Sequence, residues 1–137
     1  MASLTPVAPD KVEVLSNVDK ALAWDLAGPD LPAVDVALDM VEQFTEKGRI
    51  VADGLRTLVL SIPVDSDAGI SAQATLNEAS RRLYLSPPSG TPRTAGHRAQ
   101  NLARLVQGLY RAVERVTEEQ ARSARPQAQH VTTKGSR

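Results

Sequence analysis

The chain has 137 residues, of which 42% are hydrophobic and 23% are charged, and its formal net charge is zero. These values are those of one ordinary globular domain, so they exclude a chain that is disordered throughout. The absence of cysteine excludes disulfides, thiolate metal sites and cysteine nucleophiles.

The beginning of the chain and its hydropathy favour a cytoplasmic location. Residues 1–14 lack the charged and then apolar pattern of a secretory signal. No run of about 18 apolar residues is present, so we expect no membrane span.

The zero net charge hides a gradient along the chain. Residues 1–68 contain five Lys/Arg and twelve Asp/Glu, a difference of −7, whereas residues 69–137 contain eleven and four, a difference of +7. Such asymmetry predicts either that the two halves pair within one fold or that a charged surface meets a partner.

Four amphipathic segments follow one another along the chain. We expect residues 1–9 to form a flexible tail and Asp10 to cap a first helix, which the sequence AGPD at 27–30 would end. Its apolar stripe would consist of Val14 or Leu15, Val18, Leu22 and Leu26.

The second predicted helix covers residues 31–62 and has the most regular pattern. It would begin at Asp30, with Pro32 tolerated in the first turn, and would end before Pro63. Apolar or small residues recur every three or four positions, namely Val34, Leu38, Val41, Phe44, Gly48, Val51 or Ala52, Leu55, Leu58 or Val59, and Ile62.

The third predicted helix runs from Asp67 to Leu85, and the fourth covers residues 94–124, with Gly108 in its interior. The inner faces would be formed by Ala72, Leu76, Ala79 and Leu83, and by Leu102, Leu105, Val106, Leu109, Val113 and Val116. We expect residues 125–137 to be a flexible tail. The whole predicts an all-α fold, a four-helix up-down bundle over residues 10–124 with two long and two shorter helices.

Both long helices carry a row of like charges away from their apolar side. The arginine row of the fourth helix falls within about 40° on a helical wheel, and the acidic row of the second falls within about 60°. Each row spans 18 residues, or about 27 Å, so the two could lie alongside each other within one chain or between chains. The arginine row consists of Arg104, Arg111, Arg115 and Arg122, and the acidic row of Asp35, Asp39, Glu42, Glu46 and Asp53.

Three interpretations of the arginine row stay open: a solvated face, a protein interface and a nucleic-acid site. Glu118 and Glu119 are spaced to pair with Arg115 and Arg122, which favours the solvated face. Acids interleave with the arginines and Tyr110 is the one aromatic there, which disfavours nucleic acid.

Trp24 is a further candidate for partner binding. Placed on the first helix, it would point away from the apolar stripe, where a tryptophan can anchor a partner or a dimer. Alternatively, a loop such as residues 86–93 covers it.

No pattern of catalytic, cofactor or metal-binding residues stands out. His97 and His130 do not follow a glutamate by three positions, as the histidines of di-iron bundles do. The loop SPPSGTPRTAG lacks a phosphate-binding motif, and Asp39 and Glu42 are more typical of a solvated face than of a metal site. We therefore predict no catalytic residue and no cofactor.

Three stretches resemble an actinobacterial family of uncharacterised small proteins that carry the label "natural product biosynthesis protein". They are GLRTLVLSIPVDSD (54–67), NEASRRLYL (77–85) and HRAQNLARLVQGLYRAVERV (97–116), and the similarity covers roughly residues 10–116. The excess of arginine over lysine also fits a high-GC actinomycete. The resemblance implies a bacterial cytoplasmic protein encoded near specialised-metabolite or regulatory genes, and it implies no reaction.

The sequence therefore favours a non-catalytic interaction or regulatory protein, whose partner is another protein or a second copy in a homodimer. One alternative is an accessory enzyme or small-molecule carrier with a pocket in the bundle core. A further alternative is a DNA-associated regulator.

Overall fold

The computed structural model describes the backbone of residues 7–88 and 90–135, and the side chains of residues 11–88 and 90–124. Within these residues the chain forms four α-helices and one short 3-10 helix, and no strand. The helices are α1 (Val7–Leu22), α2 (Val34–Leu58), η2 (Val59–Ser61), α3 (Asp67–Arg82) and α4 (Pro92–Gly135). The predicted all-α class is confirmed.

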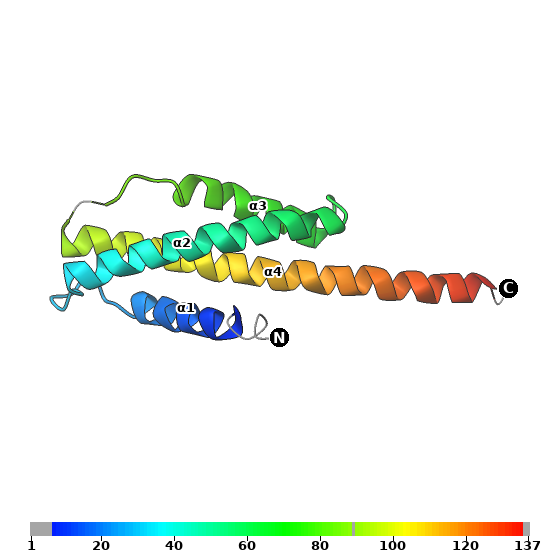
Figure 1. Ribbon diagram of the computed structural model, residues 1–137, viewed down its shortest axis with the longest axis horizontal. Coiled ribbons are helices and arrows are strands. Elements are labelled where there is room, and N and C mark those ends of the chain that lie inside the picture. The colour runs from blue at the N-terminus through cyan, green and yellow to red at the C-terminus, as the bar shows by residue number, and fades with distance from the viewer. Residues whose placement is uncertain (1–6, 89, 136–137) are drawn as a thin grey trace.

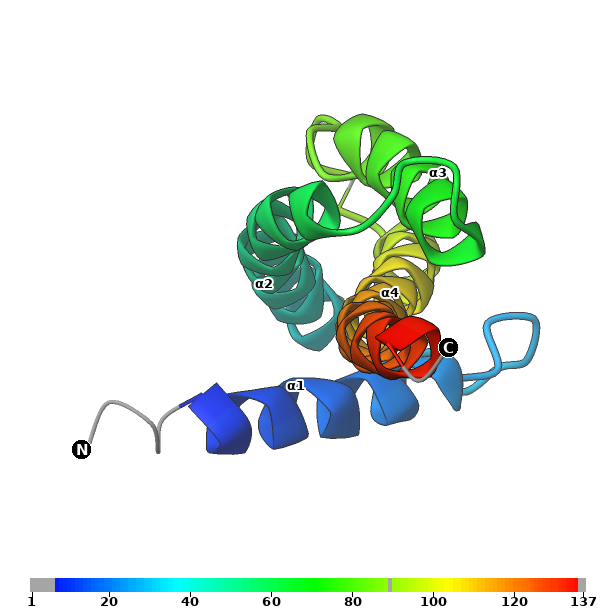
Figure 2. The ribbon, with the colours of Figure 1, turned by 90° about the vertical axis from the view of Figure 1, so that its right-hand side faces the viewer.

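The long helix α4 is the central element, because it packs against each of the other three α-helices and most extensively against α2 (Figure 1). Viewed along the long axis of the molecule, α2, α3 and α4 are seen roughly end-on, whereas α1 is seen from the side (Figure 2). Helix α1 therefore crosses the other three obliquely. These contacts support a helical bundle, and they do not establish the regular up-down arrangement that the sequence predicts.

The core is mostly aliphatic and lies where the helical pattern predicts it. Leu102, Leu105 and Leu109 of α4 are buried, as are Phe44 and Leu55 of α2. The predicted inner face of α3 is also buried, through Ala72, Leu76, Ala79 and Leu83. Burial of this apolar surface is the main favourable contribution to the free energy of folding.

The boundaries of α1 differ from the prediction at both ends. The helix begins at Val7, so Asp10 lies inside it and is not its N-cap. Pro9 is tolerated because the first backbone N–H groups of a helix have no partner within the helix. The helix ends at Leu22, before the predicted AGPD stop.

Helix α2 begins at Val34, later than predicted, and Asp30 does not cap it. Its N-cap residue is Ala33, with φ −61° and ψ 141°, and no side chain caps it. Pro32 disfavours helical backbone at the residue before it, which keeps Leu31 outside the helix. The helix passes into η2, which ends just before Ile62 and Pro63.

Helix α3 begins at Asp67, as predicted, and Ser66 caps it by accepting a hydrogen bond from the Gly69 N–H at 3.1 Å. It ends at Arg82, earlier than the predicted Leu85. At this end, Nη2 and Nε of Arg49 donate hydrogen bonds to the Leu83 carbonyl oxygen at 2.7 and 3.1 Å. A guanidinium on the last carbonyls is a favourable way to end a helix.

Helix α4 continues to Gly135, so the predicted end near residue 124 is wrong for the backbone. Pro126 removes one N–H from the hydrogen-bond ladder, but its neighbours are mostly alanine, arginine and glutamine, which favour helix. The flexibility of residues 1–9 and 125–137 stays a prediction, and residues 1–6 and 136–137 lie outside the described part. None of the described helices combines the length and hydropathy needed to cross a bilayer.

Candidate interaction surfaces

The arginine row is exposed along α4, and its members have different neighbours. Nη1 of Arg122 pairs with Oε1 of Glu119 at 2.8 Å, as the sequence predicts. Nη1 of Arg115 instead donates a hydrogen bond to Oγ of Ser71 on α3 at 3.0 Å. The row therefore runs beside the seam between α3 and α4.

Like Arg115, Arg104 and Arg111 have no carboxylate partner among the described residues. Nη1 of Arg104 lies 3.4 Å from Oδ1 of Asn101, a long hydrogen bond to a neutral group. Within the described part of the chain, Arg111 makes no ion pair or side-chain hydrogen bond and is exposed to solvent. Their positive charges are available to an anionic partner.

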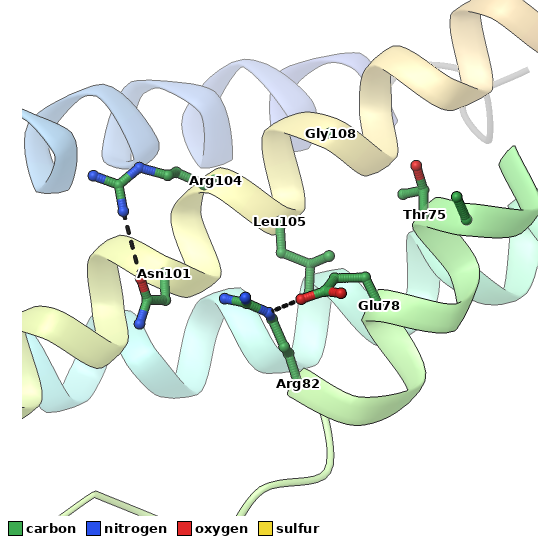
Figure 3. Close-up of a pocket in the computed structure, with 8 residues that line it drawn as sticks. Thr75, Glu78, Arg82, Asn101, Arg104, Leu105 and Gly108 are labelled. Atoms are coloured by element: carbon green, nitrogen blue, oxygen red, sulfur yellow. Dashed lines mark hydrogen bonds and ion pairs between the residues drawn. The ribbon is translucent and has the colours of Figure 1, made fainter. Parts of the chain in front are cut away.

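An open groove of about 400 Å³ lies between α3 and α4, next to Arg104 (Figure 3). The Leu105 side chain points from α4 toward α3, between Arg104 on one side and Arg82 on the other (Figure 3). Gly108 leaves open space here, because a Cβ added to it would meet no atom within 4 Å. Its lining consists of Ala74, Thr75, Glu78, Arg82, Asn101, Arg104, Leu105 and Gly108.

The one carboxylate in the groove, Glu78, is held by two arginines of its own helix. Arg82 pairs with it through Nε and Arg81 through Nη2. The hydrogen bond from Arg82 is the main cause that lowers the pKa of Glu78 below its ordinary value. Because Glu78 is matched by Arg81 and Arg82, Arg104 gives the groove an excess of positive charge.

The acidic row lies on the face of α2 that points away from the core. All five of its members are exposed. Oδ1 of Asp53 pairs with Nη1 of Arg56 one turn away at 2.6 Å. None of the ion pairs formed by the described side chains joins this row to the arginine row. The sequence allowed the two rows to pair within one chain or between two chains. The described side chains show no such pairing within one chain.

Trp24 does not lie on α1, because that helix ends two residues earlier. It lies in the following turn and is half-buried, packed against the hydrophobic core. Its carbonyl oxygen accepts a hydrogen bond from Nε2 of the buried Gln100 at 2.9 Å, and the Ala21 carbonyl oxygen accepts another at the same distance. The Gln100 side chain thus fixes the end of α1 on α4. The buried part of Trp24 belongs to the packing of the core.

Two residues at these surfaces were missed by the sequence analysis as functional candidates. Ile50 is 59% exposed on α2, beside the acidic row, although its type predicts burial. Gly108 opens the groove. Its presence in a helix interior could have drawn attention to this position, because glycine weakens a helix by about 1 kcal/mol relative to alanine. The groove lies at the surface, and the pocket in the bundle core stays a prediction.

The described side chains include no group of three His, Asp or Glu residues placed to hold a metal ion. Comparisons of this chain with known protein families, curated proteins and solved structures find no match.

Proposed function

We propose that this protein is a non-catalytic interaction protein whose arginine row binds an acidic surface of a protein partner or of a second copy. The observation that carries the proposal is the state of Arg104 and Arg111, which are exposed beside the α3–α4 groove without a carboxylate partner among the described residues. The acidic row of α2 is a complementary surface of the same kind.

The strength of such binding follows from the exposure of the charges. Ion pairs between exposed side chains contribute about 0.2–1 kcal/mol each, and salt screens them. Two or three such pairs give weak and salt-sensitive association, so a stable complex needs an apolar contact beside them. The α3–α4 groove offers one, with Leu105 and Gly108 in its lining.

A protein partner fits the groove better than a small molecule does. Sites for small molecules usually bury about 70–90% of the ligand surface, whereas this groove is open to solvent. The resemblance of residues 10–116 adds a cytoplasmic, actinobacterial setting linked to specialised metabolism. We keep that setting, and the up-down connectivity of the bundle, as parts of the proposal.

The test is affinity capture from a lysate of the source cell, with the wild-type chain and charge-reversed variants as bait. Arg111→Glu and the double variant Arg104→Glu/Arg111→Glu should lose the proteins that the wild type retains at about 0.05 M salt. Lys20→Glu, an equal charge change on exposed α1, is the control and should retain them. Quantitative mass spectrometry measures the difference.

Retention of the same proteins by all four baits would contradict the proposal, because the row would then be a solvated face only. Recovery of nucleic acid instead of protein, confirmed by a gel shift with duplex DNA, would favour the DNA-associated regulator. Arg111 is suited to the reversal because it makes no ion pair or side-chain hydrogen bond with the described residues that the change would break.

A further inference from the structure

The outward face of α2 carries an exposed apolar side chain between two acids. Ile50 is 59% exposed and lies one turn after Glu46 and one turn before Asp53. On a helical wheel the three fall within about 60° of one another, on the side opposite the buried residues of α2. We call Glu46, Ile50 and Asp53 the α2 knob.

The seam between α3 and α4 has the opposite features in the same spacing. Gly108 leaves open space beside Leu105, with Arg104 one turn before it and Arg111 one turn after it. These three positions also fall within about 60° on the wheel of α4. We call Arg104, Gly108 and Arg111, with the groove beside them, the α4 socket.

From this match we infer that the α2 knob of one copy of the chain docks in the α4 socket of a second copy. When α2 of one copy lies antiparallel to α4 of the other, Ile50 faces Gly108. The charged residues on either side then face each other in register to within one residue: Glu46 opposite Arg111, and Asp53 opposite Arg104. The positions around the two helices also match in this antiparallel orientation. On the helical wheel, Ile50 is offset from Glu46 and Asp53 in the same direction as Gly108 is offset from Arg104 and Arg111. The inference rests on the proposed function and names the partner as the chain itself.

The placement of the two surfaces decides the geometry of the assembly. Figure 2 shows α2 on the opposite side of the bundle from the seam between α3 and α4. A docked pair therefore leaves one knob and one socket free, which is a head-to-tail contact and continues into rings or chains. A two-fold dimer through either surface would instead place like charges against each other.

Sedimentation velocity of the purified full chain tests this assembly. The wild type should form species larger than a monomer at concentrations up to about 1 mM and low salt, and should dissociate at about 0.5 M salt. Ile50→Lys and Gly108→Leu should each weaken the contact at least about tenfold. Both sites are open to solvent, so both variants should keep the helical circular dichroism of the wild type.

A matched control and a charge swap distinguish this contact from non-specific association. Val12→Lys changes an apolar residue of α1 that is 69% exposed, and it should leave the association unchanged. Arg111→Glu and Glu46→Arg should each weaken the association. The double variant Glu46→Arg/Arg111→Glu should restore it, because the swapped charges again face each other.

The decisive experiment mixes two variants that cannot assemble alone. The Ile50→Lys chain keeps its socket, and the Gly108→Leu chain keeps its knob. An equimolar mixture should form a complex of one copy of each and nothing larger. A wild type that stays monomeric at about 1 mM, or a mixture that stays monomeric, would overturn the inference.

The outcomes also separate this inference from the proposed function. A monomeric chain whose Arg111→Glu variant still loses captured proteins would overturn the self-docking and leave the proposed function standing. Retention of all captured proteins by the Arg111→Glu bait, together with a monomeric wild type, would overturn both.

Discussion

Two glycines of α2 provide a sharp test of the core packing, because alanine should stabilise the protein at one of them and should not do so at the other. A Cβ added to Gly54 would meet no atom within 4 Å. A Cβ added to Gly48 would lie 2.8 Å from Cδ2 of Leu83 and 3.6 Å from Cγ2 of Val106. Both sites are inside one helix, so the intrinsic helix preference of alanine is the same at each.

The expected size of the effects follows from these distances. Alanine stabilises a helix interior by about 0.8–1 kcal/mol relative to glycine, so Gly54→Ala should raise the free energy of unfolding by about 1 kcal/mol. At Gly48 the gain is opposed by overpacking, which costs about 1–3 kcal/mol in a core. Leu83 is only 1% exposed and cannot move into solvent. The two variants should therefore differ in stability by about 1–3 kcal/mol.

Urea denaturation followed by far-UV circular dichroism measures the difference, at high salt and low protein concentration so that association does not contribute. The m-values should agree, so that the midpoints report stability alone. In a Leu83→Ala background Gly48→Ala should become stabilising, because the opposing methyl group is gone. Equal stabilisation by Gly48→Ala and Gly54→Ala in the wild-type background would refute the close approach of α2 to Leu83.

Three further predictions concern single contacts. Gln100→Met removes two hydrogen bonds at 2.9 Å from a buried site, and denaturation should show a loss of about 1–3 kcal/mol; an unchanged midpoint would mean that they do not hold the end of α1. Ser66→Ala removes the cap of α3 and should lower the free energy of unfolding by about 1 kcal/mol in the same assay, whereas no loss would contradict the capping bond. The lowered pKa of Glu78 means that its ion pairs stabilise the fold above its ordinary pKa of 4.5 and are lost as the pH falls through its folded pKa. An NMR titration of its carboxyl carbon should therefore give a midpoint below 4.5, raised by Arg82→Gln, and an unmoved midpoint would contradict the role of Arg82.

Helical periodicity was a reliable guide to the core. Leu105 and Leu109 are buried because residues three and four apart share a face of a helix, a relation that depends on the chain alone. The same local rule predicted the Arg122–Glu119 pair. The start of α3 was also predictable, because Pro63 and the polar residues that follow interrupt the preceding pattern.

The errors fall where a contact between distant segments replaces a local signal. Trp24 was placed on a helix that in fact ends at Leu22, where the side chain of Gln100, far along the chain, takes the carbonyl oxygens. Arg115 was expected to pair with glutamates on its own helix, and it bonds to Ser71 of α3 instead. Neither partner can be identified from spacing within one helix.

By itself the sequence determined that this chain is helical, which residues form its inner faces and which faces are charged, because these properties repeat with the period of one helix. Only the tertiary structure decided where the arginine row meets the seam between α3 and α4, and that Gly108 opens a groove there. The reason is physical. The rotation and shift of one helix against another depend on the packing of all four helices, and they cannot be derived from the periodicity of any single helix.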